Sequence, residues 1–379
     1  MNIILSNLGF VCALGNSKEE IIQNAISKNS GIIKTKDDIP NRNIPFGFVK
    51  TNDTKPMRCY TLLDMAFSQI KDDIENLKKS YALSRIGIVL GSSNTGIHEA
   101  QKHIEQWIKT NNCPADFSFD EIELGSPAVY LQKITGTKGP AYTVSTACSS
   151  SAKVFRSARD LIKNDICDIV IVGGVDSHCA FTQNGFFALE SISTEQTNPM
   201  SKNRSGINLG EGCALFIMQK SEKANGVKLL GIGESSDAYH LTHPEPNGNG
   251  AELAMTLALK DANLTSDKID YINMHGTGTI ANDSMESLAI SRVFTNSVLC
   301  ASTKPLTGHA LGASGAIEAG LSYLMLKNQV IIPHIYDGNY DDTLPKLNLA
   351  NGNEAKHLSI ILSNSFAFGG SNASLILGL

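Results

Sequence analysis

Short apolar runs rich in β-branched residues recur along the chain and alternate with amphipathic segments. Runs of this kind are typical of strands buried in a sheet, whereas apolar positions three and four residues apart are typical of helices. We expect buried strands at residues 85–90, 168–172, 269–274 and 358–362. Helical spacing is present at residues 252–259 and 316–328. The alternation of the two patterns predicts a layered α/β fold.

Two strand-turn-helix segments resemble each other within the chain. Residues 141–162 and 298–326 both run from an apolar strand ending in Ser-Thr into a helix rich in small residues. Alanine and glycine on a helix allow neighbouring elements to approach closely, so each helix is expected to be central. The similarity indicates two duplicated halves. The polar stretch at 219–228 has no apolar period. We place the domain boundary inside it, which gives domains at 1–224 and 225–379.

The first residues predict a strand, a turn and a helix. Residues 1–16 contain a short apolar run without a preceding basic segment, and residues 17–20 (Ser-Lys-Glu-Glu) have the pattern of a capping box that opens a helix. We therefore expect no signal peptide. No apolar stretch reaches the roughly 18–20 residues that a membrane-spanning helix needs. The expectation is a soluble cytoplasmic protein that does not associate with membranes.

Composition narrows the class of ligand. The chain has 379 residues, of which 42% are hydrophobic and 18% are charged, so it can bury a large core. Its formal net charge is -5, and no basic stripe interleaved with aromatic residues occurs. These features argue against nucleic-acid binding and favour a small or carrier-borne substrate.

Eight cysteines are scattered without a C-x-x-C pair, which argues against a zinc site and against a redox motif. Most are expected to be small buried hydrophobic residues in a reducing compartment. Cys148 differs because it follows an expected strand and opens an expected helix. The free N–H groups and the dipole of a helix N-terminus stabilise a thiolate. Cys148 is thus a candidate nucleophile, although this local pattern equally fits another buried cysteine.

Two histidines lie in glycine-rich turns. His275 follows an expected strand in the sequence HGTGT, where open α/β sheets place ligand contacts. His309 lies in a turn that leads into the second small-residue helix. Each histidine taken alone is equally compatible with a structural role in the core. A further glycine-rich loop, residues 364–372 (NSFAFGGSN), follows the last expected strand.

Taken together and in order, these motifs resemble a known family. Cys148 in TACSSS, His275 in HGTGT, Lys304 and His309 in KPLTGHALGASGAIEA, and the NSFAFGGSN loop are similar to the elongating β-ketoacyl-acyl-carrier-protein synthases (KAS I and KAS II type) of the thiolase superfamily. Residues 208–212 and 235–240 extend the similarity. The resemblance implies a duplicated thiolase-like α/β fold of five layers, αβαβα, with the nucleophile in the first half and both catalytic histidines in the second.

The resemblance also implies roles for single residues. Cys148 would carry the acyl chain, and the backbone N–H groups of Cys148 and Phe368 would form the oxyanion hole. His275 and His309 would stabilise the enolate formed by decarboxylation of a malonyl thioester. Lys304 would orient the histidines, with Glu318 as its ionic partner, although a general acid role for Lys304 stays open. In the loop formed with Gly369 and Gly370, Phe368 would also gate access to Cys148.

No metal ligand set, phosphate loop or dinucleotide fingerprint is present, so we expect no bound cofactor and no metal. The phosphopantetheine group would arrive on an acyl carrier protein. Lys202 and Arg204 are candidates, by position alone, for contacting this carrier. By resemblance the chain would form a homodimer, or a heterodimer with a chain-length-factor-like subunit.

Details of the sequence bear on the subfamily. Ala367 stands where the family usually has a glycine, and residues 203–206 (Asn-Arg-Ser-Gly) replace a more acidic segment. Residues 125–128 and 139–153 are most similar to ketosynthases of aryl polyene pigment clusters. The alternatives are a housekeeping fatty acid elongation synthase and a non-catalytic scaffold or chain-length-factor-like subunit. The presence of Cys148, His275, Lys304 and His309 argues against the scaffold.

Other enzyme classes fit less well. A thiolase carries a second catalytic cysteine near its C-terminus, but the last cysteine here, Cys300, lies in an expected strand before the Lys304 turn. Initiating ketosynthases carry an asparagine where His309 stands. Nothing resembles the local signatures of papain-like hydrolases.

Overall fold

A computed structural model describes residues 2–35, 43–52, 54–221, 226–294 and 297–379. The helices are α1 (Lys18–Ile26), α2 (Arg58–Ser68), α3 (Lys71–Ser80), α4 (Ile97–Thr110), α5 (Ser126–Thr135), α6 (Ser150–Lys163), α7 (Ala180–Ala188), α8 (Asn249–Ala262), α9 (Ile280–Val293), α10 (Lys304–Thr307) and α11 (Ser314–Asn328). Short 3₁₀ helices are η1 (Leu83–Arg85), η2 (Phe119–Glu121), η3 (Ser266–Lys268), η4 (Leu311–Ala313) and η5 (Phe368–Gly370).

The described strands form a large sheet and a small one. The 11-stranded sheet has the order β12-β11-β10-β13-β14-β9-β1-β8-β6-β4-β5. Its strands are β1 (Asn2–Cys12), β4 (Ile86–Gly91), β5 (Ala141–Val144), β6 (Ile169–Asp176), β8 (Gly212–Ser221), β9 (Val227–Ser236), β10 (Tyr271–Asn273), β11 (Leu299–Ala301), β12 (Asn348–Leu349), β13 (Ile360–Ala367) and β14 (Ser371–Gly378). The 3-stranded sheet contains β2 (Ile32–Thr35), β3 (Ile44–Gly47) and β7 (Leu209–Gly210).

The strand order confirms the internal duplication. In the first half the order is β5-β4-β6-β8-β1, and in the second half it is β11-β10-β13-β14-β9. In each half the first three strands are parallel and the remaining two are antiparallel to their neighbours. The halves join where β1 and β9 pair, at Ile4 with Lys228 and at Leu5 with Val227.

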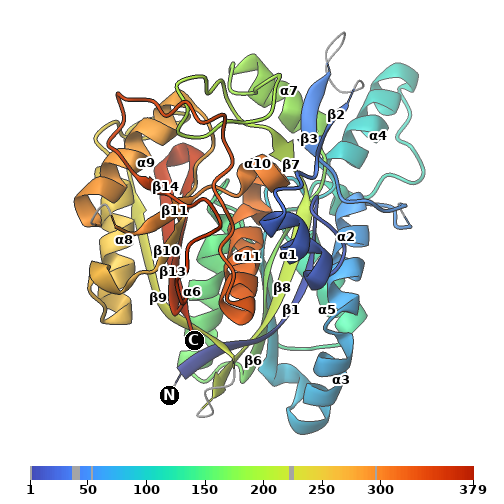
Figure 1. Cartoon of the computed structure of the whole chain (residues 1–379). Coiled ribbons are helices and arrows are strands. Elements are labelled where there is room, and N and C mark those ends of the chain that lie inside the picture. The colour runs from blue at the N-terminus through green and yellow to red at the C-terminus, as the bar shows by residue number, and fades with distance from the viewer. Residues whose placement is uncertain (1, 36–42, 53, 222–225, 295–296) are drawn as a thin grey trace.

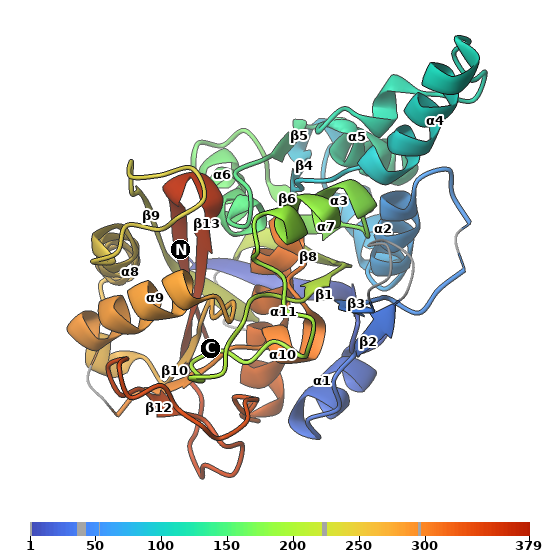
Figure 2. The same cartoon turned by 90° about the horizontal axis from the view of Figure 1, so that it is seen from above.

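Helices α6 and α11 lie between the two halves of the sheet, while α2, α3 and α5 cover the outer face of the first half and α8 and α9 cover the second (Figures 1 and 2). This arrangement is the five-layered αβαβα fold that the motifs predicted. It also explains the continuous apolar runs, because the strands are covered on both faces. In β8, for example, Phe216 and Met218 pack in the core around α6 and α11, while Leu215 and Ile217 pack in the outer core of the first half.

The central helices approach each other closely, as their small residues predicted. A Cβ atom added to Gly315 of α11 would lie 2.7 Å from the backbone nitrogen of Ala152 in α6. Such a distance is far inside van der Waals contact, so the crossing needs a glycine. This crossing brings the N-terminal ends of α6 and α11, and the turns that precede them, to one place between the layers.

Most element predictions are confirmed, with shifted ends. The predicted strands at 85–90, 168–172, 269–274 and 358–362 correspond to β4, β6, β10 and β13. The polar stretch at 219–228 overlaps the end of β8 and the start of β9, while residues 222–225 lie outside the described residues. No helix in the described ranges has the length and apolar character needed to cross a bilayer.

The predicted capping box of α1 is half right. The Ser17 hydroxyl accepts the N–H of Glu20 at 3.2 Å, as an N-cap residue should. The Glu20 carboxylate, however, accepts the N–H of Asn16 at 2.9 Å and not that of Ser17. The reciprocal bond is therefore displaced by one residue.

Candidate active site

Cys148 lies in a sharp turn between β5 and α6. Ala147 has a φ of 51°, a left-handed conformation that costs a residue with a side chain about 1–2 kcal/mol. The turn is held by Ser150, whose hydroxyl donates to Ala147 O at 2.5 Å and accepts the N–H of Thr146 at 2.9 Å. The first sequence-predicted site residue thus projects from the start of α6 towards the pocket.

Burial changes the chemistry expected of this thiol. All eight cysteines are free and seven of them are buried, Cys113 being the exposed one, so burial alone does not distinguish Cys148. Burial raises the pKa of Cys148 to about 11, while Lys304 and the N–H groups of Phe368 and Cys148 lower it. The expected donors do favour the thiolate, but desolvation outweighs them, so the thiol form is favoured in the resting site.

His275 follows β10 in a turn that a buried carboxylate holds. Glu286, in α9, accepts the N–H of His275 at 2.7 Å and that of Gly276 at 2.6 Å. Gly276 has a φ of 41°. Burial raises the pKa of Glu286 to about 7. Sequence reasoning missed Glu286, because it binds backbone groups and has no motif of its own.

His309 lies in the turn between α10 and η4. Its Nδ1 accepts the N–H of Leu311 at 3.2 Å and lies 2.8 Å from the Ser314 hydroxyl. A ring nitrogen that accepts a backbone N–H carries no proton, so in the neutral ring the proton is on Nε2. The backbone contacts of Leu311 therefore determine the tautomer of His309.

Lys304 and Glu318 form a buried pair behind His275. The ammonium group donates to His275 O at 2.5 Å, lies 3.4 Å from His275 Nδ1 and pairs with Glu318. Both side chains are at most 3% exposed. Burial raises the pKa of Glu318 to about 7, and Lys304 opposes that rise. The predicted ionic partnership is present, and the contact with Nδ1 leaves the proton of neutral His275 on Nε2.

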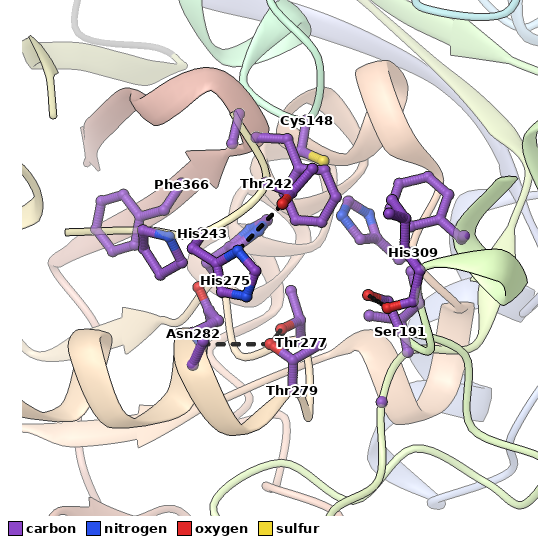
Figure 3. A pocket seen from close by; sticks show the side chains of 18 of the residues that line it. Cys148, Ser191, Thr242, His243, His275, Thr277, Thr279, Asn282, His309 and Phe366 are labelled. Carbon is purple, nitrogen blue, oxygen red and sulfur yellow. Dashed lines mark hydrogen bonds between the residues drawn. The ribbon is translucent and has the colours of Figure 1, made fainter. Parts of the chain in front are cut away.

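The structure brings the cysteine and the two histidines together. One ligand atom from each of Cys148, His275 and His309 lies within 4.8 Å of the other two. The imidazole rings are nearly perpendicular, with centroids 5.3 Å apart. All three residues line one cavity of about 360 Å³, together with Phe186, Thr242, His243 and Phe368 among others. Figure 3 shows the cysteine sulfur and both rings facing this cavity.

Burial keeps both imidazoles neutral. It lowers the pKa of His275 well below its ordinary value, and repulsion from Lys304, and from His309 whenever that ring is protonated, acts in the same direction. The pKa of His309 is also well below its ordinary value, owing first to burial and then to Lys304. Two neutral rings with protons on Nε2 can donate hydrogen bonds to an oxygen in the cavity.

A thiolate and two imidazoles are also the donor set of a zinc site. A metal would require unprotonated nitrogens facing the cavity. The Leu311 N–H donates to Nδ1 of His309, and the Lys304 ammonium lies against Nδ1 of His275. Neither Nδ1 can therefore take up the proton that Nε2 would lose on binding a metal. These contacts favour hydrogen-bond donation by the rings over metal ligation.

The glycine loop after β13 covers the cysteine. Phe368 lines the cavity, and its ring centroid is 5.4 Å from that of Phe186, a residue that sequence reasoning missed. The N–H of Gly369 donates to Leu241 O at 2.7 Å, and Gly370 O accepts the N–H of Asp237 at 2.9 Å. The segment around Leu241 therefore packs on the glycine loop, and the next residues, Thr242, His243 and Pro244, line the cavity. A gating motion of Phe368 stays a prediction.

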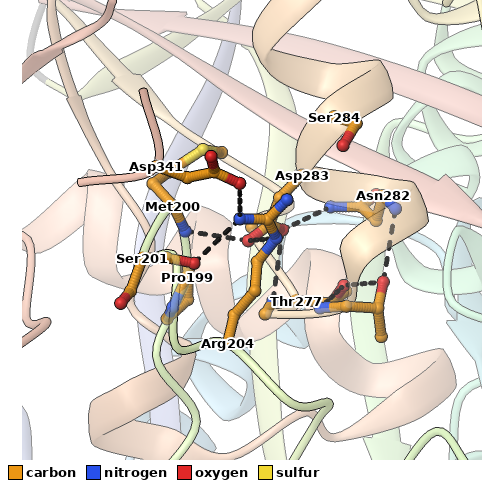
Figure 4. Close-up of polar contacts among 12 residues, drawn as sticks. Pro199, Met200, Ser201, Arg204, Thr277, Asn282, Asp283, Ser284 and Asp341 are labelled. Carbon is orange, nitrogen blue, oxygen red and sulfur yellow. Dashed lines mark hydrogen bonds and ion pairs between the residues drawn. The ribbon is translucent and has the colours of Figure 1, made fainter. Parts of the chain in front are cut away.

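The burial of Arg204 contradicts the prediction that it contacts a carrier protein. It is 7% exposed, and its guanidinium donates to Asp341 at 2.5 Å and to Ser201 O at 2.8 Å (Figure 4). Its Nε lies 4.0 Å from Asp283. Through these contacts Arg204 holds in place the backbone that continues into Ser205 and Gly206, which line the cavity. Lys202 is exposed, and its contact with a carrier stays a prediction.

Two family models match the chain. The model described as "Beta-ketoacyl synthase, N-terminal domain" matches residues 19–224, and "Beta-ketoacyl synthase, C-terminal domain" matches residues 227–336. A relative of similar length is 3-oxoacyl-[acyl-carrier-protein] synthase 2 of Vibrio cholerae, which is 29% identical over 99% of this chain and 98% of its own. The Vibrio harveyi protein of that name is 30% identical over 99% of this chain and 97% of its own.

Solved structures agree with these matches. The ketosynthase ApeO of Xenorhabdus doucetiae, solved in complex with its chain length factor ApeC, is 36% identical, with a TM-score of 0.94 over 100% of this chain and 98% of its own. The ishigamide ketosynthase/chain length factor is 26% identical, with a TM-score of 0.90 over the same shares. These similarities confirm the predicted thiolase-like fold and the resemblance from which it came.

Proposed function

Since the chain belongs to the β-ketoacyl synthase family and is a condensing acyltransferase of the 3-oxoacyl-acyl-carrier-protein synthase type, we propose that Cys148 carries the acyl chain and that His275 and His309 stabilise the malonyl enolate. The observation that carries this proposal is the surroundings of the two rings, which are buried and have contacts at Nδ1. Both are neutral, and contacts at Nδ1 leave their protons on Nε2.

In the first half-reaction, the Cys148 sulfur attacks the thioester carbonyl of an acyl carrier. The carbon–sulfur bond to the carrier breaks, and the thiol proton leaves with the pantetheine sulfur. The N–H groups of Cys148 and Phe368 both lower the pKa of the Cys148 thiol, and we assign to them the stabilisation of the oxygen of the tetrahedral intermediate. A covalent intermediate thereby separates loading from condensation.

In the second half-reaction, malonyl carrier loses carbon dioxide. The electron pair of the broken carbon–carbon bond passes to the thioester as an enolate, whose oxygen accepts bonds from His275 and His309. The enolate carbon then attacks the acyl carbonyl, and the Cys148 sulfur leaves as a thiolate. Lys304 stays behind His275, which supports an orienting role over a general acid role.

The acyl chain is proposed to be a conjugated polyene, extended iteratively on a dedicated carrier in the cytoplasm. Support comes from the resemblance of residues 125–128 and 139–153 to aryl polyene ketosynthases and from the 36% identity to ApeO. The pair formed by Phe186 and Phe368 in the cavity wall suits a flat chain, since aromatic rings favour stacking.

The partner is proposed to be a chain-length-factor-like subunit that docks on the surface formed by α4, η2 and α5. This surface exposes Ile104, Trp107, Ile108 and Phe119, and Figure 2 shows α4 projecting from the body. Strand β5, beside it, forms one edge of the large sheet. An exposed apolar patch next to an open sheet edge favours a protein partner. The complex of ApeO with its chain length factor ApeC supports this choice of partner.

Mass spectrometry of carrier-bound products tests the function. Purified chain, alone and with the proposed partner, would be incubated with malonyl carrier and with saturated or conjugated acyl carriers of equal length. We expect extension of the conjugated starter to exceed extension of the saturated one. Preference for saturated starters would favour housekeeping fatty acid elongation, and condensation that needs neither Cys148 nor the histidines would contradict the proposed mechanism.

A further inference from the structure

His309 belongs to the second half of the chain, but its backbone is held by the first half. Its N–H donates to Asn208 O at 2.7 Å, and its carbonyl accepts the N–H of Gly210 at 3.0 Å. Close approach is built into this contact, because a Cβ added to Gly308 would lie 2.5 Å from Leu209 O. His275, by contrast, is held by Glu286 of its own half.

A buried carboxylate of the first half reaches the same turn. Asp176, the last residue of β6, is fully buried, and its carboxylate accepts bonds from the Ser92 hydroxyl at 2.8 Å and the Asn94 N–H at 2.8 Å. It also accepts the N–H of Ser93 at 2.9 Å and the Ser93 hydroxyl at 2.8 Å. The Ser93 oxygen in turn accepts the N–H of Gly312 at 3.1 Å. Ser93 thus links Asp176 to the η4 turn.

The turn at Leu311 and Gly312 packs tightly against Asp176. A Cβ added to Gly312 would lie 2.7 Å from Asp176 Oδ2, so the turn sits directly on the carboxylate. The preceding residue, Leu311, has a φ of 50°, which is unfavourable for a leucine and persists only where surrounding contacts hold it. In this conformation the Leu311 N–H points at His309 Nδ1, 3.2 Å away.

We propose that Asp176 and Ser93 are positioning residues for condensation, which hold the Leu311–Gly312 turn so that the Leu311 N–H keeps the His309 proton on Nε2. Residues of the first half of the chain then orient the Nε2–H hydrogen-bond donor of His309, which belongs to the second half. This inference rests on the proposed role of His309 in stabilising the enolate. It concerns the second half-reaction, because acyl loading uses Cys148 and backbone N–H groups and does not use the His309 ring.

The test separates the two half-reactions in Ser93→Ala and Asp176→Asn. Loading of Cys148 is followed by intact-protein mass, and decarboxylation and condensation of malonyl carrier are followed separately. Losing a partner that orients a metal-bound histidine typically costs about 10–100-fold, and we expect a loss of similar size in kcat for condensation, with KM and acyl loading unchanged. The ¹⁵N resonances of His309 should shift towards a mixture of tautomers. Ser93→Thr, which keeps the hydroxyl, should restore both.

Controls make the outcomes distinct. Ser291→Ala removes a part-buried hydroxyl that donates to Leu288 O, at the end of α9 opposite to the cavity, and should condense at the wild-type rate. His309→Ala tests the underlying function: wild-type condensation in this variant would refute the role of His309 itself. Impaired His309→Ala together with unimpaired Ser93→Ala would refute the link alone, as would an equal loss of loading and condensation in Ser93→Ala. Because Ser93→Ala keeps the Asp176 carboxylate, it stays informative if Asp176→Asn does not fold.

Discussion

At the scale of single residues, burial raises the pKa of Cys148 and lowers the pKa values of His275 and His309. It favours the neutral form of each, which leaves the cysteine as a thiol and the imidazoles as hydrogen-bond donors. The neutral imidazoles suit enolate stabilisation, whereas the neutral thiol is the less reactive form of a nucleophile. Loading and condensation therefore depend on different groups and can be separated by substitution.

His275→Ala and His309→Ala should each lower the condensation rate by about 10²–10³, because each removes one donor to the enolate oxygen. Acyl loading of Cys148 should persist in both variants. Stopped assays with malonyl carrier, compared with intact mass after loading alone, measure the two steps. A variant that condenses normally would remove that histidine from the mechanism.

Alkylation of Cys148 should accelerate as pH rises. Its pKa of about 11 lies above neutral pH, so the thiolate fraction grows with pH up to that value. Below the pKa, each pH unit should raise the iodoacetamide rate about tenfold. Peptide mapping between pH 7 and pH 9 gives the slope, and Cys113, which is exposed, serves as the internal reference. A flat profile for Cys148 would show that the thiolate already predominates.

At the scale of elements, the site depends on how closely α6 and α11 cross. The two helices carry small residues where they meet, and the turns before them hold Cys148 and His309. Their crossing therefore brings together residues that lie far apart in the chain. Any side chain added at the crossing would separate the helices and, with them, the two turns.

Gly315→Val should destabilise the protein by about 1–3 kcal/mol, the usual cost of overpacking a core. A Cβ at this position meets the backbone of Ala152 at 2.7 Å, and a rigid backbone cannot yield as a side chain would. Chemical denaturation measures the loss. Gly185→Ala in α7 is the control, since its added Cβ meets nothing within 4 Å and it should be neutral or slightly stabilising. Equal stability of Gly315→Val and wild type would contradict the tight crossing.

The elements and the residues that follow their strands were predictable from local patterns. Buried strands, small-residue helices and the turns of Cys148, His275 and His309 all leave a signal within a dozen residues. Glu286 and Asp176 leave none, because each holds backbone groups that only the fold brings near. Arg204 was predicted wrongly for the same reason: in a polar turn it has the pattern of a surface residue, but its partner Asp341 lies far along the chain.

At the scale of the whole molecule, the surface formed by α4, η2 and α5 is the proposed docking site for the partner subunit. Ile108→Glu, which alters a side chain that is 78% exposed, should abolish pairing with a chain-length-factor-like subunit and leave the thermal stability of the single chain unchanged. Light scattering of the co-expressed pair measures the assembly. Leu253→Glu on α8, at a position 49% exposed, is the matched control. Loss of pairing in both variants, or in neither, would move the interface elsewhere.

The sandwiching of α6 and α11 between the two halves of the sheet has a consequence for biosynthesis. When Ser221 completes β8, roughly 90 further residues must be translated before Ser314 begins α11, a delay of about 5–20 s at ordinary rates of synthesis. During that interval, the face of α6 that α11 will cover has no partner from its own chain. The nascent first half is thus a natural client for chaperones that shield apolar surface, and separately expressed halves should aggregate where the intact chain folds.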